Sequence, residues 1–263
     1  LSAGARFGED QLHSDGANGF SPSHAESGLS QVYGTLTDAD GRKRVGLVDL
    51  SEDTATDAIT LLEAREEAFD AGGVLEPVVF QTDSEWRMLY AGQSGGQTFL
   101  GLARSIDGLT WAAEENPVLE PGEGWDSLEV RPGALTWDGE TYRLWYTGND
   151  GSRERIGWAT SSDGLSWTRE SGPADDWVFE PGAPGSFDDS SVADPHVRVN
   201  GDEIELWYSG FDGDQWSIGY AVSEDGGASW ERHLGPVTGV PHPVLRGVSG
   251  SFDPVSYTHL TLP

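Results

Sequence analysis

Short apolar runs alternate with glycine-rich polar turns along nearly the whole chain. Runs such as LWYTG from Leu144 and IGWATS from Ile156 are rich in aromatic and apolar residues and are followed by Asn-Asp-Gly or Ser-Asp-Gly. This pattern is typical of β-strands joined by tight turns, and a helical period of about 3.6 residues is weak. The stretch 57–69, DAITLLEAREEAF, is the exception, because its irregular apolar positions are compatible with a helix or a long inserted loop.

The strand pattern is repeated. Three segments align with one another: Met88–Trp111, Leu144–Trp167 and Leu206–Trp230. A weaker copy surrounds Tyr33, and the period is about 60 residues, somewhat longer than that of the commoner propeller repeats. Each unit predicts a proline-containing strand first and a tryptophan-bearing strand last. The sequence therefore predicts an all-β fold, a β-propeller whose blades are four-stranded antiparallel sheets.

We expect one propeller domain over residues 1–254. The stretch VSYTHLTLP at 255–263 shares no pattern with the repeat and resembles the translation of an adapter used in sequencing libraries. We therefore expect a non-native tail after an incomplete propeller, and a natural terminal strand is the alternative.

The turns before the three tryptophans resemble Asp boxes, with the sequences SIDGLTW, SSDGLSW and SEDGGASW. We expect their acids, Asp107, Asp163 and Asp225, to close hairpin turns by accepting backbone N–H groups, while the tryptophan packs between blades. These three aspartates are therefore predicted to be structural.

The charge of the chain disfavours some classes of binding partner. The formal net charge is -30, from 45 acidic and 15 basic residues. Such a surface repels phosphate backbones and anionic lipid, so we expect no nucleic-acid binding, and no apolar run approaches the roughly 18 residues of a membrane span. The absence of cysteine excludes disulfides and thiolate metal sites.

One position changes its chemistry from repeat to repeat. The residue directly before the proline is Ser21, Glu76, Arg131 or Asp194. We predict that the proline-containing strand is the innermost of each blade, so these side chains would meet at the propeller axis. Strand alternation would place His196 on the side of Asp194, and Glu129 on the side of Arg131. Divergence at one axial position is what a single asymmetric site on a repeated frame would show.

The axial set has the groups for glycoside hydrolysis. That reaction needs one carboxylic acid to protonate the leaving oxygen and one carboxylate to act as base or nucleophile. We predict Asp194 as the ionised carboxylate and Glu76 or Glu129 as the proton donor. Substrate binding is predicted for Arg131, His196 and Ser21. A rim position or a structural ion pair between blades is the alternative for the charged residues.

The aromatic residues Trp145, Trp207 and Tyr208 could form sugar-stacking platforms, but alternation along strands favours a core position.

The combination of WYTG or WYSG, IGWATSSDGLSW or IGYAVSEDGGASW, and the pair Asp194-Pro195 resembles the five-bladed propeller glycosidases. These form the clan that holds the β-xylosidase/arabinanase and β-fructosidase/levansucrase groups. The likeness spans most of Pro77 to Pro254. It implies a five-bladed propeller, of which this chain contains about four blades, with Asp194 as a site aspartate and Glu76 or Glu129 as the site glutamate. The chain departs from the family in carrying Ser21 where an acid is expected, and in the order of its acids.

The hypothesis is a glycoside hydrolase-like propeller that acts on poly- or oligosaccharide. A non-catalytic carbohydrate-binding or surface propeller is the alternative, supported by Ser21. A sialidase-like Asp-box protein is disfavoured, because it would need three axial arginines and only Arg131 stands at that position. We expect a carbohydrate ligand and no cofactor or metal, although an axial calcium ion is compatible with the acids. We further expect a secreted or extracytoplasmic monomer.

Overall fold

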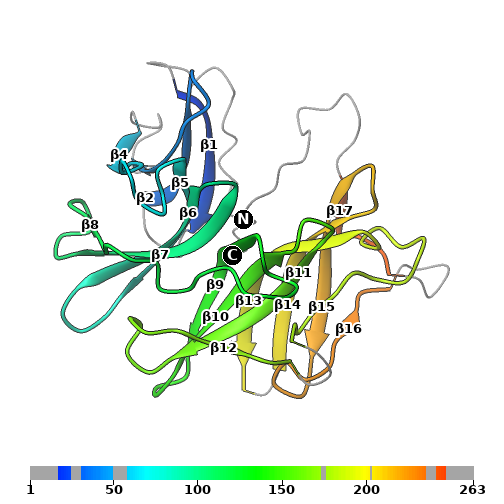
Figure 1. Cartoon of the computed structure of the whole chain (residues 1–263). Helices are drawn as coiled ribbons and strands as arrows, with labels where there is room; N and C mark the ends of the chain where they lie inside the picture. Colours follow the sequence, from blue (N-terminus) through cyan, green and yellow to red (C-terminus); the bar gives the residue numbers. More distant parts are fainter. Residues whose placement is uncertain are drawn as a thin grey trace.

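The computed structural model describes residues 17–24, 31–49, 58–172, 176–201, 203–234 and 241–246. These residues form strands and turns, and no helix is found among them. Within the same ranges, therefore, no helix is long and apolar enough to cross a membrane. The strands fall into four antiparallel units of four strands that follow one another along the chain (Figure 1). The predicted all-β propeller fold is confirmed.

The strand bounds define the four blades. Blade 1 consists of β1 (Ala17–His24), β2 (Gln31–Asp38), β3 (Lys43–Asp49) and β4 (Ile59–Leu62). Blade 2 consists of β5 (Gly73–Gln81), β6 (Trp86–Ser94), β7 (Gln97–Ser105) and β8 (Ala112–Ala113). Blade 3 consists of β9 (Glu129–Trp137), β10 (Tyr142–Asn149), β11 (Glu154–Ser161) and β12 (Thr168–Glu170). Blade 4 consists of β13 (Ser191–Asn200), β14 (Glu203–Phe211), β15 (Trp216–Ser223) and β16 (Glu231–Arg232), and β17 (Leu245–Arg246) also pairs with β15.

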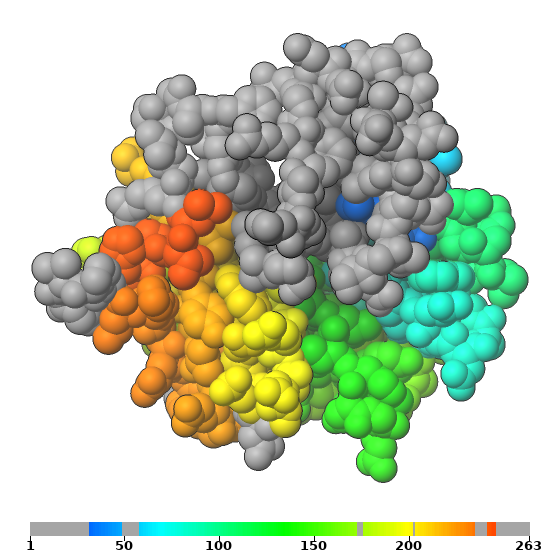
Figure 2. Space-filling view, turned by 180° about the vertical axis from the view of Figure 1, so that it is seen from behind, coloured from blue at the N-terminus to red at the C-terminus, as the bar shows by residue number. Residues whose placement is uncertain are grey.

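Neighbouring blades meet mainly through side chains. Among the described strands, one parallel pair, Thr98 with Glu129, connects β7 of blade 2 to β9 of blade 3. Figure 2 shows blades 2, 3 and 4 as adjacent sectors, coloured cyan, green and yellow to orange. The prediction for residues 255–263 lies outside the described residues, and the single-domain prediction for 1–254 extends beyond them.

The described part of the stretch 57–69, residues 58–69, contains no helix, and its apolar run forms the strand β4. Within it, β4 pairs antiparallel with β3, so that Val45 lies opposite Leu62. Both side chains are buried, and they belong to a core cluster that also contains Tyr33 and Tyr90. This short apolar run forms a strand because it buries its side chains by completing the sheet of blade 1, although its sequence pattern is irregular.

Aromatic residues fill the spaces between blades, as predicted for the Asp-box tryptophans. Trp145 of blade 3 is fully buried, and its ring centroid lies 5.8 Å from that of Trp230 in blade 4. Trp111 of blade 2 meets Tyr33 of blade 1 edge to face at 6.4 Å. Tyr208 is also buried, so Trp145 and Tyr208 are core residues.

The Asp-box acids are structural. Asp163 Oδ1 accepts backbone N–H groups from Leu165 and Ser166 at 2.8 and 2.9 Å, and Asp107 and Asp225 close their turns in the same way. These hydrogen bonds lower the pKa of Asp163. Gly164 completes the turn with a φ of 68°.

A buried Asp–Tyr–Arg triad, which the sequence pattern did not predict, recurs inside the blades. In blade 4, Asp188 Oδ2 accepts from the Tyr208 hydroxyl at 2.8 Å and from Arg232 Nε at 2.8 Å. In blade 3 the same contacts join Asp126 to Tyr146 and Arg169, at 3.1 and 2.7 Å. In blade 2, Asp70 and Tyr90 are joined by Arg65. Each triad fixes the start of a blade to its second strand.

Candidate active site

The inner strands of three blades converge on one arginine. Arg131 on β9 lies between Glu76 on β5 and Asp194 on β13, so three pre-proline positions predicted from the repeat are neighbours. Its side chain is 14% exposed. The proline-containing strands therefore supply adjacent residues.

Four carboxyl groups surround the Arg131 guanidinium. Nη1 lies 3.0 Å from Glu76 Oε1 and 3.4 Å from Asp194 Oδ1. Nε lies 3.3 Å from Glu129 Oε2, and Nη2 donates to Glu154 Oε1. Four acids share one base, so the cluster is far from charge balance. Such an arrangement is unfavourable unless some of the carboxyl groups bind protons or a ligand.

Glu76 and Asp194 share an uncommon backbone conformation. Their φ angles are 52° and 51°, in the left-handed region that residues other than glycine rarely adopt. In both blades a β-bulge sits at this point, between Leu75 and Val78 and between Ala193 and His196. A strained conformation of this kind costs about 1–3 kcal/mol and is concentrated at functional sites. Arg131 is not among the positive-φ residues described.

The preceding blade supports each strained residue. The backbone N–H of Glu76 donates to Thr35 Oγ1 at 2.9 Å, and that of Asp194 donates to Thr147 Oγ1 at 2.8 Å. Thr35 follows Tyr33 by two residues, and Thr147 follows Tyr146 directly. In blade 2, ahead of Arg131, Ala91 directly follows the repeated Tyr90, and no positive φ needs support there. A supporting threonine hydroxyl is therefore present in the two blades that precede a left-handed acid, and a threonine is absent from the corresponding position of the blade that precedes Arg131.

A glycine allows β9 and β13 to approach. A Cβ at Gly133 would lie only 2.5 Å from Pro195 Cγ. The close contact brings Arg131 next to Asp194, whose proline neighbour fills the space that a side chain would need.

The axial environment perturbs the titration of Asp194. Burial raises its pKa to about 7, and the carboxylates of Glu76 and Glu154 act in the same direction, while Arg131 opposes them. Burial also raises the pKa of Glu154. A carboxyl group with a pKa near 7 is protonated in an appreciable fraction of molecules at neutral pH.

The pKa of Asp194 bears on the role that was predicted for it. We expected Asp194 to be ionised and Glu76 or Glu129 to supply the proton. A raised pKa suits a proton donor, so the environment of Asp194 is also compatible with the acid role. Glu76 instead makes the 3.0 Å ion pair with Arg131.

Ser21 and His196 are the remaining predicted residues. Ser21 pairs through its backbone with Thr35 on β2, and its side chain lies outside the described residues. The ring of His196 packs against Trp207, with centroids 6.2 Å apart. The bulge before His196 interrupts the simple alternation that was expected to place it beside Asp194.

Glu154 belongs to the cluster but was missed. It is the first residue of β11, and its backbone N–H donates to Ser191 Oγ at 3.1 Å. The equivalent positions, three residues before the repeated glycine, are Lys43, Thr98 and Trp216. This position also changes chemistry from blade to blade, so the same comparison of repeats would have found it.

The axial residues do not fit a calcium ion. The guanidinium group of Arg131 lies where the carboxyl groups converge, which is the place that a cation would take. Across the described ranges, no group of three or more His, Asp or Glu side chains has the arrangement of a metal site.

The chain resembles curated proteins in sequence over part of its length. No protein-family model matches the chain. An uncharacterized protein of Mycobacterium tuberculosis, Rv1502, is 29% identical over 156 residues, which is 57% of this chain and 50% of that protein. The chain therefore spans about half the length of this curated relative.

Several solved structures share the architecture. A thermostable family-43 glycoside hydrolase superposes with a TM-score of 0.60 at 18% identity, over 87% of this chain and 74% of the other. A GH130 structure, from a family described as mannoside phosphorylases that contains glycoside hydrolases, gives 0.64 at 16%, over 86% and 71%. A BT0996 complex with RGII gives 0.62 at 20%, over 82% and 73%. The chain shares the β-propeller fold of these structures.

Proposed function

We propose that the protein is a glycoside hydrolase that cleaves poly- or oligosaccharide at the Arg131 cluster. One observation carries the proposal: two acids from different blades, Glu76 and Asp194, adopt the same strained conformation and face the same arginine. Packing alone does not require a positive φ at an acidic residue. The glycoside hydrolase neighbours and the RGII complex support a carbohydrate substrate.

The roles follow from the environment of each group. Asp194 donates its proton to the glycosidic oxygen as the C–O bond breaks. Glu76 stabilises the positive charge that develops on the sugar, as nucleophile or as the base that activates water. Arg131 pairs with Glu76, Asp194, Glu129 and Glu154, and so holds the acids together at the site.

We propose a retaining mechanism because the two acids lie close together. Glu76 Oε1 and Asp194 Oδ1 lie 3.0 and 3.4 Å from the same nitrogen. Retaining enzymes keep their carboxyl groups ~5–5.5 Å apart, whereas inverting enzymes keep them ~6.5–9.5 Å apart to admit a water molecule.

The proposal is tested with a panel of aryl glycosides and oligosaccharides. Asp194→Asn and Glu76→Gln are each expected to lower kcat/KM by about 10²–10⁴-fold, since each removes a proton donor or a carboxylate. Asp214→Asn, an exposed acid of blade 4, is the matched control and keeps full activity. Unchanged hydrolysis in both site variants would contradict the assignment. NMR of the first-formed anomer tests retention.

A non-catalytic carbohydrate-binding protein is the second candidate. The observation that favours it is the position of Arg131, whose guanidinium lies between Glu76 and Asp194, where a sugar would have to enter. Oligosaccharide binding by the parent protein without turnover of any panel member would select this candidate. A secreted location and a monomeric state stay predictions for either function.

A further inference from the structure

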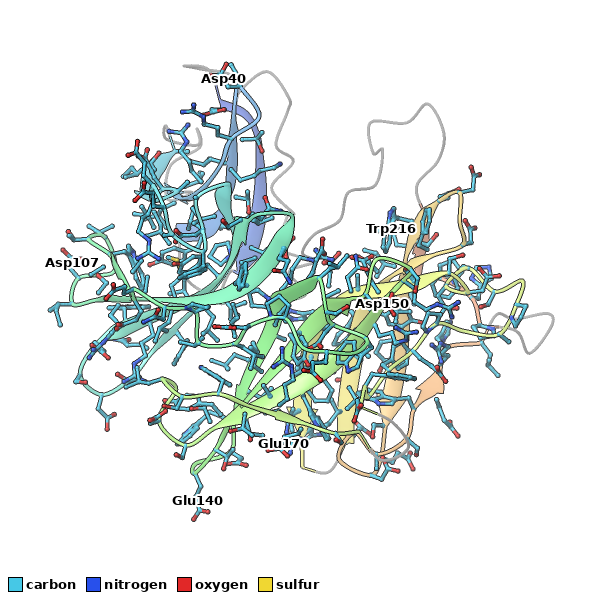
Figure 3. All side chains as sticks on the ribbon, in the orientation of Figure 1. Asp40, Asp107, Glu140, Asp150, Glu170 and Trp216 are labelled. Atoms are coloured by element: carbon cyan, nitrogen blue, oxygen red, sulfur yellow. The ribbon has the colours of Figure 1, made fainter. Side chains whose placement is uncertain are left out.

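A large cavity lies at the opposite end of the inner strands from Arg131. It has a volume of about 590 Å³ and is lined by the β5–β6 hairpin, the β9–β10 hairpin and the Asp-box turn of blade 3. From Glu76 to Gln81, which lines the cavity, β5 extends for about 16 Å at ~3.3 Å per residue. Figure 3 labels Glu140 at the tip of the β9–β10 hairpin and Asp150 beyond the other end of β10. One sugar ring cannot reach both places.

Aromatic rings form one side of this cavity. The Trp137 side chain is exposed, with 50% of the residue accessible. Its ring centroid lies 4.1 Å from that of Tyr142, and Tyr142 lies 5.4 Å from Phe80. Trp86 from the adjacent hairpin also lines the cavity. Phe80, Tyr142 and Trp137 therefore make a row that crosses from blade 2 to blade 3.

The propeller frame does not require aromatic residues at these positions. Trp137 pairs with Tyr142 at the end of its hairpin, and the equivalent pair in blade 4 is Asn200 with Glu203. Both of those residues are exposed and polar. Burial likewise does not explain an indole that remains half exposed. A ligand that contacts the ring face does explain it.

The charges around the cavity disfavour an anionic ligand. Arg87, the cationic residue among those that line it, is buried and paired with Glu85 at 2.9 Å. It also donates to the backbone oxygen of Asp163. Exposed Asp83 adds negative charge to the rim of a molecule whose net charge is already -30. An anionic ligand would be repelled.

We propose that this groove, defined by Phe80, Trp86, Trp137 and Tyr142, is a second binding site for a neutral oligosaccharide chain. Sugar rings present apolar C–H faces that stack on Trp137 and Tyr142, and their hydroxyls can bond the polar rim of Gln81, Asp83 and Ser84. The site holds the chain on the face away from the carboxylates. It does not depend on hydrolysis at the Arg131 cluster.

The test is calorimetric titration of the full chain with cellohexaose, xylohexaose and mannohexaose, and with hexagalacturonate as the anionic probe. At least one neutral hexasaccharide is expected to bind, and hexagalacturonate more weakly. Trp137→Ala should weaken binding at least about tenfold, which equals about 1.4 kcal/mol, whereas Trp137→Phe should retain most of it. Asp194→Asn should leave this binding unchanged.

Each other outcome overturns the proposal. These are the absence of binding to all three neutral probes, tighter binding of hexagalacturonate, or unchanged affinity in Trp137→Ala. Loss of binding in Asp194→Asn would place the ligand at the axial cluster instead. The melting temperature of Trp137→Ala, expected within about 2 °C of the parent because the indole is half exposed, shows that the fold is intact.

Discussion

The axial cluster and the triads inside the blades both place buried acids against an arginine, but their stoichiometry differs. In the triad of blade 4, one acid, Asp188, is bonded by one arginine, the Tyr208 hydroxyl and a further hydroxyl from Ser186. At the axis, four acids surround Arg131. The triad is repeated in three blades, and the cluster occurs once in the part of the chain that the structure describes. A repeated and balanced network serves the scaffold, whereas a unique and unbalanced one is a candidate for chemistry.

The largest effect is expected from removing the arginine of the cluster. Arg131→Leu leaves four neighbouring carboxyl groups without this cation, and loss of one partner from a buried ionic group costs about 3–5 kcal/mol. Urea unfolding at pH 8 measures the loss, which should shrink at pH 5, where the acids can take up protons. Arg153→Leu, an exposed arginine, is the control. Equal free energies of unfolding for the parent and Arg131→Leu at pH 8 would show that Arg131 does not stabilise the four carboxylates.

The second effect is the pH dependence caused by Asp194. Between about 4, the pKa of aspartate in an unfolded chain, and about 7, the folded protein binds more protons than the unfolded chain. Rising pH therefore lowers the free energy of unfolding in this window. Asp194→Asn cannot ionise, so its melting temperature should fall by several degrees less from pH 5 to pH 8. Parallel curves for the parent and the variant would contradict the raised pKa.

A triad variant should weaken the scaffold without touching the axis. Asp188→Asn replaces charged hydrogen bonds to Tyr208 and Arg232 with weaker ones, so we expect a loss of about 2 kcal/mol in urea unfolding. Asp214→Asn should change the free energy of unfolding by less than about 0.5 kcal/mol. If Asp188→Asn altered the pH dependence assigned to Asp194, the two networks would not be separate.

The smallest effect is expected at the supporting hydroxyl. Thr147→Val leaves the backbone N–H of Asp194 without its acceptor, which should cost about 1 kcal/mol. Thr160→Val, which removes a hydroxyl bonded to Glu170 at the surface, is the matched control. Equal unfolding midpoints for the two variants would mean that the hydroxyl does not hold the strained conformation.

The sequence repeat was sufficient to predict the fold and part of the candidate site. The aligned segments predicted the strands and the Asp-box turns, and the pre-proline position predicted that Glu76, Arg131 and Asp194 would be neighbours. At His196 simple alternation no longer dictates the side of the strand on which the ring lies, because a bulge interrupts the strand there. Such a bulge depends on contacts with the preceding blade, which no local pattern reveals.

Glu154 and the triads were missed for different reasons. Glu154 lies on the third strand of its blade, whereas all the predicted axial residues came from the first, proline-containing strands. The triad acids were visible in the repeated Phe-Asp or Trp-Asp pair, but their partners lie on other strands of the blade. The arginine of blade 2 even comes from a different place in the repeat, since Arg65 precedes its acid by five residues.

The support of each strained acid from the blade before it sets a boundary for recombination. Thr147 lies on a strand of blade 3 but accepts a hydrogen bond from the backbone of Asp194 in blade 4. Likewise, Thr35 lies in blade 1 and accepts from the backbone of Glu76 in blade 2. A chimera that exchanged blade 4 as a whole would therefore separate Asp194 from its acceptor. A crossover between β9 and β10 would keep them together. The modular unit of this propeller is offset from the blade by one strand.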